Sequence, residues 1–268
     1  MNPCEQGDAQ LAILVWELEQ MYLDSPRSLT PTWVHPEIGE QFIILSHVFC
    51  KEALFDAKCL TIGEKDVFMG VLCKRFSDGK IFFALRGTEN IIEWIDDADT
   101  EEEYLGVNVI VEKGFYALSK TIGMTPYNHI FTSDKVTYVG HSLGGALAVL
   151  LAYKAGASVI TFGCPRVGNK EWCIWAGYRI KKESRMYAYT NDLVPLLPQQ
   201  PYVPLSFYEV KLCAPVNPTK GAPEAPGAIG NHSCLTYAWL IDNNIPIPQD
   251  VPSKWTRFVN WITSIFMQ

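Results

Sequence analysis

A serine between two glycines, in Gly140-His141-Ser142-Leu143-Gly144, has the residue types and spacing of a catalytic nucleophile. In this arrangement the serine occupies a sharp turn between a strand and a helix, where a side chain at either glycine would collide with its neighbours. The strain of the turn holds the hydroxyl clear of the sheet. A turn that merely packs closely would explain the glycines but not the serine, so we expect Ser142 to be a nucleophile.

The sequence on both sides fits such a turn. Residues 135–139 are β-branched and aromatic, as is typical of a buried strand. Residues 143–155 consist mainly of strong helix formers, and Gly156 follows where a left-handed helix cap is expected. A short motif alone is only a hypothesis. The predicted strand before it and helix after it favour the catalytic interpretation.

A serine nucleophile needs a base, and in α/β-hydrolases the chain order is serine, acid, histidine. The chain has five histidines, at positions 35, 47, 129, 141 and 232. Only His232 follows Ser142. A lone histidine is more often structural than catalytic, but here His232 is the single candidate for the base.

The acid of a triad must be held firmly, because it orients the histidine. The acids between Ser142 and His232 are Glu171, Glu183, Asp192, Glu209 and Glu224. Asp192 follows a predicted strand at the carboxyl edge of the sheet, where active-site groups collect, and two prolines stiffen the next segment. Asp192 is therefore the first candidate and Glu209 the reserve. The alternative for Asp192 is an ordinary turn residue beside Asn191.

An oxyanion hole needs two backbone donors, one from the residue after the nucleophile and one from an earlier loop that follows a strand. Leu143 supplies the first. Residues 83–88 end a strand in a glycine and a hydroxyl residue, which places the amide of Thr88 well for the second. The alternative is an ordinary turn at the end of a strand.

The remaining elements alternate between helix and strand. An apolar stripe predicts a helix over residues 8–23, with Asp8 as its cap. Strands are expected at residues 67–72, 81–85, 158–162, 185–190 and 207–212, the first two as a hairpin. A loop is expected over residues 215–230, and a final helix over about residues 253–266 with its aromatic stripe against the core. This alternation predicts a largely parallel sheet with helices on its faces.

Length and composition limit the class of protein. The 268 residues fit one large α/β domain, residues 1–268, and the net charge of −7 argues against nucleic acid as a partner. No segment has the pattern of a secretory signal or a membrane-spanning helix. The eight cysteines lack metal spacing, so we expect most to be reduced and buried. These features favour a cytoplasmic protein, with export without a signal as the alternative.

Several short motifs carry a family resemblance. They are Leu85-Arg86-Gly87-Thr88, Trp94 with Asp97, Gly114-Phe115, residues 140–147, residues 162–169, residues 191–195 and His232. In this order, over residues 65–240, they resemble the class 3 (fungal-type) lipases. The resemblance implies an α/β-hydrolase fold, hydrolysis of acylglycerols or related carboxylic esters, no metal and no cofactor, and an oxyanion contact from the Thr88 hydroxyl as well as its amide. Two features depart from the family. Leu193 stands where many members have proline, and the pattern of a secretory signal is missing although the well-known members are secreted.

The segment after Thr88 occupies the position of the family's lid. Ile91, Ile92, Trp94 and Ile95 give residues 89–96 an apolar side. This side either opens toward lipid as a moving lid or stays docked as a structural turn. Just beyond it, acidic residues between Asp96 and Glu103 would repel anionic membranes and favour neutral or short esters.

These observations predict a serine carboxylic-ester hydrolase of the lipase type. Its partners would be a lipid or small ester substrate and, transiently, a lipid interface. A phospholipase A1 or an acyltransferase with the same triad is the alternative enzyme. A non-catalytic binding or signalling protein on the same scaffold is the alternative of another class, because a fold does not fix a function.

Overall fold

A computed structural model describes residues 7–24, 32–34, 41–51, 66–88, 102–123, 135–213 and 231–242. Its main sheet has eight strands in the order β1-β2-β3-β4-β7-β8-β10-β12. They are β1 (Thr32–Val34), β2 (Gln41–Lys51), β3 (Asp66–Arg75), β4 (Ile81–Leu85), β7 (Val136–His141), β8 (Ser158–Phe162), β10 (Arg185–Tyr189) and β12 (Glu209–Leu212). The strands from β1 to β4 pair antiparallel, and those from β4 to β12 pair parallel. The largely parallel sheet is thus confirmed.

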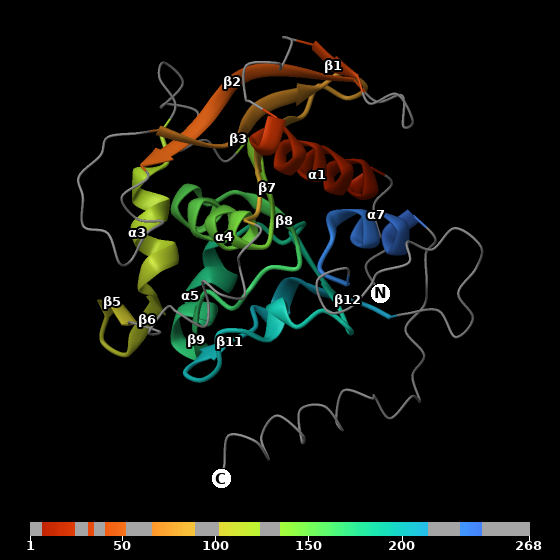
Figure 1. Cartoon of the computed structure of the whole chain (residues 1–268). Helices are drawn as coiled ribbons and strands as arrows, with labels where there is room; N and C mark the ends of the chain where they lie inside the picture. Colours follow the sequence, from red (N-terminus) through yellow and green to blue (C-terminus); the bar gives the residue numbers. More distant parts are fainter. Residues whose placement is uncertain are drawn as a thin grey trace.

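Helices cover both faces of this sheet (Figure 1). One face carries α3 (Lys113–Thr121), α4 (Leu143–Ala155) and α5 (Lys170–Arg179), and the other carries α1 (Asp8–Asp24) and α7 (Cys234–Asp242), which lie side by side. Because successive strand residues point to opposite faces, Phe83 and Tyr138 join the core under α4, while their neighbours Phe82 and Val139 join the core under α1. The fold is therefore a sheet between two helical layers.

A smaller antiparallel sheet lies beside α3 and α5 (Figure 1). Its strands are β11 (Tyr202–Val203), β9 (Gly168–Asn169), β6 (Val109–Glu112) and β5 (Glu102–Gly106). Two short 3-10 turns, η4 (Val194–Leu196) and η5 (Ser206–Tyr208), flank β11. None of these elements is among the predicted ones, and Glu102 and Glu103 of the acidic run prove to begin β5.

Two local predictions need correction. Asp8 is the first residue of α1 instead of the residue before it, and its buried carboxylate accepts hydrogen bonds from Nε of Arg185 at 2.5 Å and from the hydroxyl of Tyr187 at 2.7 Å. The last strand begins at Glu209 instead of residue 207, because Ser206–Tyr208 forms a 3-10 turn. The hydroxyl of Tyr208 holds that turn by donating to the carbonyl of Ile180 at 2.8 Å.

The remaining predictions either agree with the structure or concern residues that it does not describe. Gly156 ends α4 with φ of 67°, the predicted left-handed cap. Of the six cysteines within the described ranges, five are buried, as predicted, and Cys213 is partly exposed. No helix in the described part of the chain is long and apolar enough to cross a membrane. The expected loop over residues 215–230 and helix over residues 253–266 lie outside the described residues.

Candidate active site

Ser142 sits on a strained turn between β7 and α4. Its φ of 55° and ψ of −128° lie in a region that residues with a side chain rarely adopt. A Cβ on Gly140 would overlap the carbonyl of Gly144, and a Cβ on Gly144 would overlap the carbonyl of Arg86. Both glycines are therefore required by close backbone approach, and they hold Ser142 in the geometry of a nucleophile elbow.

His232 and Asp192 form a buried hydrogen-bonded pair. Nδ1 of His232 lies 2.7 Å from Oδ2 of Asp192. Since a carboxylate only accepts hydrogen bonds, Nδ1 is the donor, and Nε2 of the neutral ring is left as an acceptor. Nε2 of His232 and Oγ of Ser142 are both buried and have no hydrogen-bond partner among the described residues. The pair thus leaves a free basic nitrogen, as a general base requires.

The environment keeps His232 neutral. Burial lowers the pKa of His232, and the nearby charge of His141 lowers it further, while Asp192 acts in the opposite direction. The pKa lies below its ordinary value as a result, so the ring is unprotonated near neutral pH and ready to accept a proton.

Backbone and side-chain groups fix the Asp192 carboxylate. Its Oδ1 accepts the amide of Val194 at 3.0 Å, and its Oδ2 accepts the hydroxyl of Tyr237 at 2.6 Å. Behind the pair, Gly163 has φ of 58°, and a Cβ there would lie 2.8 Å from Oδ2 of Asp192 and 2.9 Å from the His232 ring. Only glycine fits this contact without displacing the pair.

The backbone that carries Thr88 runs beside the elbow. The buried Arg86 side chain holds this strand end by donating from Nε to the carbonyl of Phe68 and from Nη1 to that of Gly87, both at 2.7 Å. A Cβ on Gly87 would lie 3.0 Å from Cβ of Ser142. Thr88 is the next residue, and Leu143 is the first of α4. Thr88 therefore follows Gly87, which lies against Ser142, and Leu143 follows Ser142 itself. Both predicted oxyanion donors are thus next to the nucleophile turn.

The sequence analysis assigns no role to three polar residues near the site, which are Glu19, His141 and Tyr237. Oε1 of Glu19 lies 2.7 Å from Nδ1 of His141 and accepts the amide of Gly87 at 3.0 Å. Nε2 of His141 lies 2.5 Å from the carbonyl oxygen of His232. One sequence feature points to Glu19, since it falls four residues after the buried Val15 on the apolar face of α1.

Cys234 brings a third potential metal ligand to Glu19 and His141, with the ligand atoms within 4.8 Å of one another. Both ring nitrogens of His141 are already engaged in hydrogen bonds, however. Neither nitrogen retains a lone pair for coordination, so this group does not fit a metal centre.

The reserve acid Glu209 lies at the start of β12, where its carboxylate is 3.6 Å from Nζ of Lys211. Asp192, in contrast, bonds directly to the His232 ring. The predicted lid residues, Ile91, Ile92, Trp94 and Ile95, lie outside the described residues.

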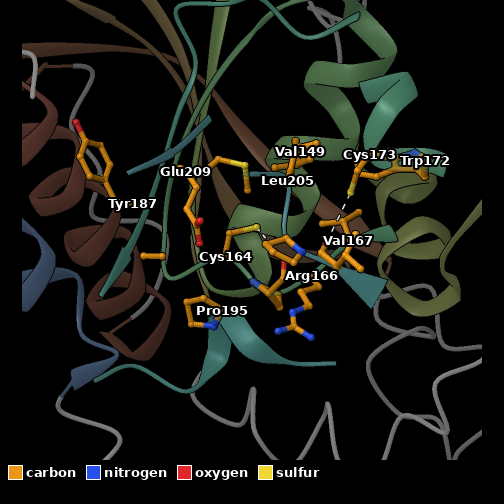
Figure 2. A pocket seen from close by; sticks show the side chains of 15 residues that line it. Val149, Cys164, Arg166, Val167, Trp172, Cys173, Tyr187, Pro195, Leu205 and Glu209 are labelled. Carbon is orange, nitrogen blue, oxygen red and sulfur yellow. Dashed lines mark hydrogen bonds between the residues drawn. The ribbon is translucent and has the colours of Figure 1, made fainter. Parts of the chain in front are cut away.

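A small cavity of about 30 Å³ lies on the α4 side of the sheet (Figure 2). Cys164, Arg166 and Trp172 line it, and neither Ser142 nor His232 does. Nε of Arg166 and Nε1 of Trp172 are buried without a hydrogen-bond partner in the described ranges. The cavity is polar in part and has the size for a water molecule instead of an acyl chain, so it does not serve as the substrate pocket.

The comparisons with known proteins give a consistent result. A model of the lipase (class 3) family matches residues 82–202. Lipase A of Sodiomyces alcalophilus is 38% identical over 24% of this chain and 20% of its own length. Triacylglycerol lipase OBL1 of Arabidopsis thaliana is 27% identical over 41% of this chain and 23% of its own length. The structure of a mono- and diacylglycerol lipase from Aspergillus oryzae is similar with a TM-score of 0.57 and 20% identity, over 90% of this chain and 100% of that one.

Residues 82–202 are similar to the class 3 lipase family, and the fold of the chain is that of an α/β-hydrolase. Both findings agree with the resemblance seen in the sequence. The alignments with the two sequence relatives span less than a quarter of the length of either relative. The match to the family model includes Thr88, Ser142 and Asp192 but ends before His232.

Proposed function

We propose that this protein hydrolyses lipid carboxylic esters through an acyl-enzyme on Ser142. One observation carries the proposal: the buried His232–Asp192 hydrogen bond of 2.7 Å, which leaves Nε2 of His232 free near the strained Ser142 turn. The names of the relatives support acylglycerols as the substrate class.

In the first half of the reaction, Nε2 of His232 takes the proton of Ser142 while Oγ attacks the ester carbonyl carbon. The carbonyl electron pair moves onto oxygen, and the amides of Thr88 and Leu143 bind the resulting oxyanion. The tetrahedral intermediate then collapses, and the leaving alkoxide takes the proton from His232 and departs as an alcohol. An acyl ester remains on Ser142.

In the second half, His232 removes a proton from water, and the hydroxide attacks the acyl carbon. The second intermediate releases the carboxylic acid and returns the proton to Ser142. Asp192 holds the ring in the required tautomer and stabilises the imidazolium that forms in both halves.

A series of p-nitrophenyl esters from acetate to palmitate, with and without emulsified triglyceride, tests the proposal. We expect hydrolysis by the wild type and a loss of at least about a thousandfold in Ser142→Ala, as for removal of a triad nucleophile. Residual activity within tenfold of the wild type would exclude Ser142 as the nucleophile. Phosphatidylcholine as substrate and glycerol as acceptor separate a phospholipase A1 and an acyltransferase from a lipase.

A further inference from the structure

Glu19 of α1 connects three parts of the active site that lie far apart in the sequence. Its Oε1 accepts the Gly87 amide at 3.0 Å, at the strand end that carries Thr88. The same oxygen lies 2.7 Å from Nδ1 of His141, the residue before Ser142. The Glu19 side chain is 22% exposed and that of His141 is 6% exposed, so this is not a surface contact.

The hydrogen bonds of His141 define its charge. Its ring nitrogens face the carboxylate of Glu19 and the main-chain carbonyl of His232, and both of these groups only accept hydrogen bonds. Both nitrogens must therefore carry a proton, which makes His141 an imidazolium. The amide of Gly87 donates to the same Glu19 oxygen, which favours the ionised carboxylate.

The charged ring then contacts the catalytic histidine in two ways. Nε2 of His141 donates to the carbonyl oxygen of His232 over 2.5 Å, which restrains the main chain at that residue. The two rings also face each other, with centroids 4.4 Å apart and planes inclined by 34°. The orientation of His232 is thus fixed from its backbone by His141 and from its ring by Asp192.

We propose that Glu19 is a positioning residue of the active site, which holds His141 as an imidazolium against His232 and holds the Gly87 amide beside the oxyanion loop. This inference rests on the proposed function of Ser142 and His232. Glu19 acts through its neighbours and touches no reacting atom.

The charges around the ring pair agree with this role. The titratable groups that face it are Glu19 from α1, Asp192 from the segment after β10, and Cys234 and Tyr237 from α7. Burial is the largest single influence on the pKa of His141 and lowers it, but Glu19, Asp192 and the carbonyl of His232 together raise it more, so the net pKa lies above the ordinary value. Burial is the largest single influence on the pKa of Glu19 and raises it, but His141, the Gly87 amide and His232 together lower it more, so the net pKa lies below the ordinary value.

The substitution Glu19→Gln tests the proposal, because it keeps the shape and the acceptor oxygen for Gly87 but removes the charge that holds the His141 proton. We expect kcat for a soluble ester to fall about tenfold, on the scale of a hydrogen bond to a charged group. We also expect the acid limb of the profile of kcat/KM against pH to move to higher pH, since a neutral His141 no longer repels a proton on His232. A purely structural role for Glu19 would not move this limb.

Glu17→Gln is the matched control, with the same chemical change two residues away on a different face of α1. It should leave kcat and the acid limb near those of the wild type. If Glu19→Gln folds and behaves like this control, Glu19 is not a positioning residue. Ester hydrolysis that survives in Ser142→Ala would instead overturn the proposed function, so the two failures are distinguishable.

A measurement on the wild type decides the matter even if Glu19→Gln does not fold. Imidazole nitrogen chemical shifts at pH 7 should show one histidine with both nitrogens protonated, above the ordinary histidine pKa of about 6.5. Its signal should be absent from a His141→Gln variant, which assigns it. A neutral His141 at this pH would overturn the proposal, whatever the catalytic activity of the protein.

Discussion

The hydroxyl of Tyr237 donates to Oδ2 of Asp192 over 2.6 Å. The same oxygen accepts Nδ1 of His232, which lies just before α7, the helix that carries Tyr237. The Tyr237 oxygen in turn accepts the amide of Tyr189 at 3.1 Å. Burial raises the pKa of Tyr237 well above its ordinary value, so its proton stays in place. The helix α7 therefore follows just after the base, His232, and carries Tyr237, which holds the acid, Asp192.

The substitution Tyr237→Phe should weaken catalysis without abolishing it, because Asp192 keeps its bonds to Val194 and His232. We expect kcat/KM to fall about tenfold, the scale of one hydrogen bond to a charged group. Tyr208→Phe is the control: it removes a buried hydroxyl that bonds to main-chain carbonyls away from the site. Both variants should lose stability in urea unfolding, but only Tyr237→Phe should lose activity in ester assays; equal activities would leave Tyr237 with a structural role alone.

Asp192 and Glu209 can be distinguished by neutralising each in turn. Asp192→Asn should lower kcat by at least about a hundredfold more than Glu209→Gln, because only the group bonded to Nδ1 of His232 sets its tautomer. Steady-state kinetics on a soluble ester gives both values. The reverse order would identify Glu209 as the acid and contradict the site described above.

In the wild type, the acid limb of the profile of kcat/KM against pH should have its midpoint below the ordinary histidine pKa. The reaction needs neutral His232, so kcat/KM falls as pH drops through the pKa of this ring. Burial and the charge of His141 lower that pKa, which places the midpoint below about 6.5. A midpoint above this value, measured in the stable range of the protein, would mean that His232 is not held neutral by its surroundings.

The ion pair between Asp8 and Arg185 should contribute to the stability of the fold. Their side chains are only 4% and 8% exposed, and Nε of Arg185 lies 2.5 Å from Asp8. Removing one charge of a buried pair typically costs about 3 to 5 kcal/mol, and we expect Asp8→Asn to fall near this range in denaturant unfolding. Glu103→Gln breaks the exposed pair with Lys120 and should cost less than about 1 kcal/mol. Similar losses in the two variants would contradict the structural role given to Asp8.

Much of the fold could be predicted because strand and helix periodicity is local. The strands β4, β7, β8 and β10, the helix α4 and its glycine cap follow from short apolar or helix-forming runs. The strand β2 was not predicted, since Ser46 and His47 interrupt its apolar run. The two-residue strands β9 and β11 are too short to leave a period in the sequence.

The candidate site likewise has residues that the sequence could predict and residues that it could not. Chain order and the elbow motif point to Ser142, Asp192 and His232, and the structure brings the latter two into contact. Glu19 and Tyr237 could not be assigned roles from the sequence, because their partners lie 122 and 45 residues away. An acidic side chain on an apolar helix face indicates a buried partner but does not say which one. Only the packing of α1 and α7 on the sheet identifies it.

Covalent labelling tests the central claim most directly. A fluorophosphonate probe reacts with serine only when a neighbouring base and an oxyanion site activate its hydroxyl. We expect one probe per chain, located on Ser142 by peptide mass spectrometry, with no labelling of a folded Ser142→Ala variant and much slower labelling of Asp192→Asn. A folded wild type that stays unlabelled, or carries the probe on another residue, would contradict the assignment of Ser142 as the nucleophile.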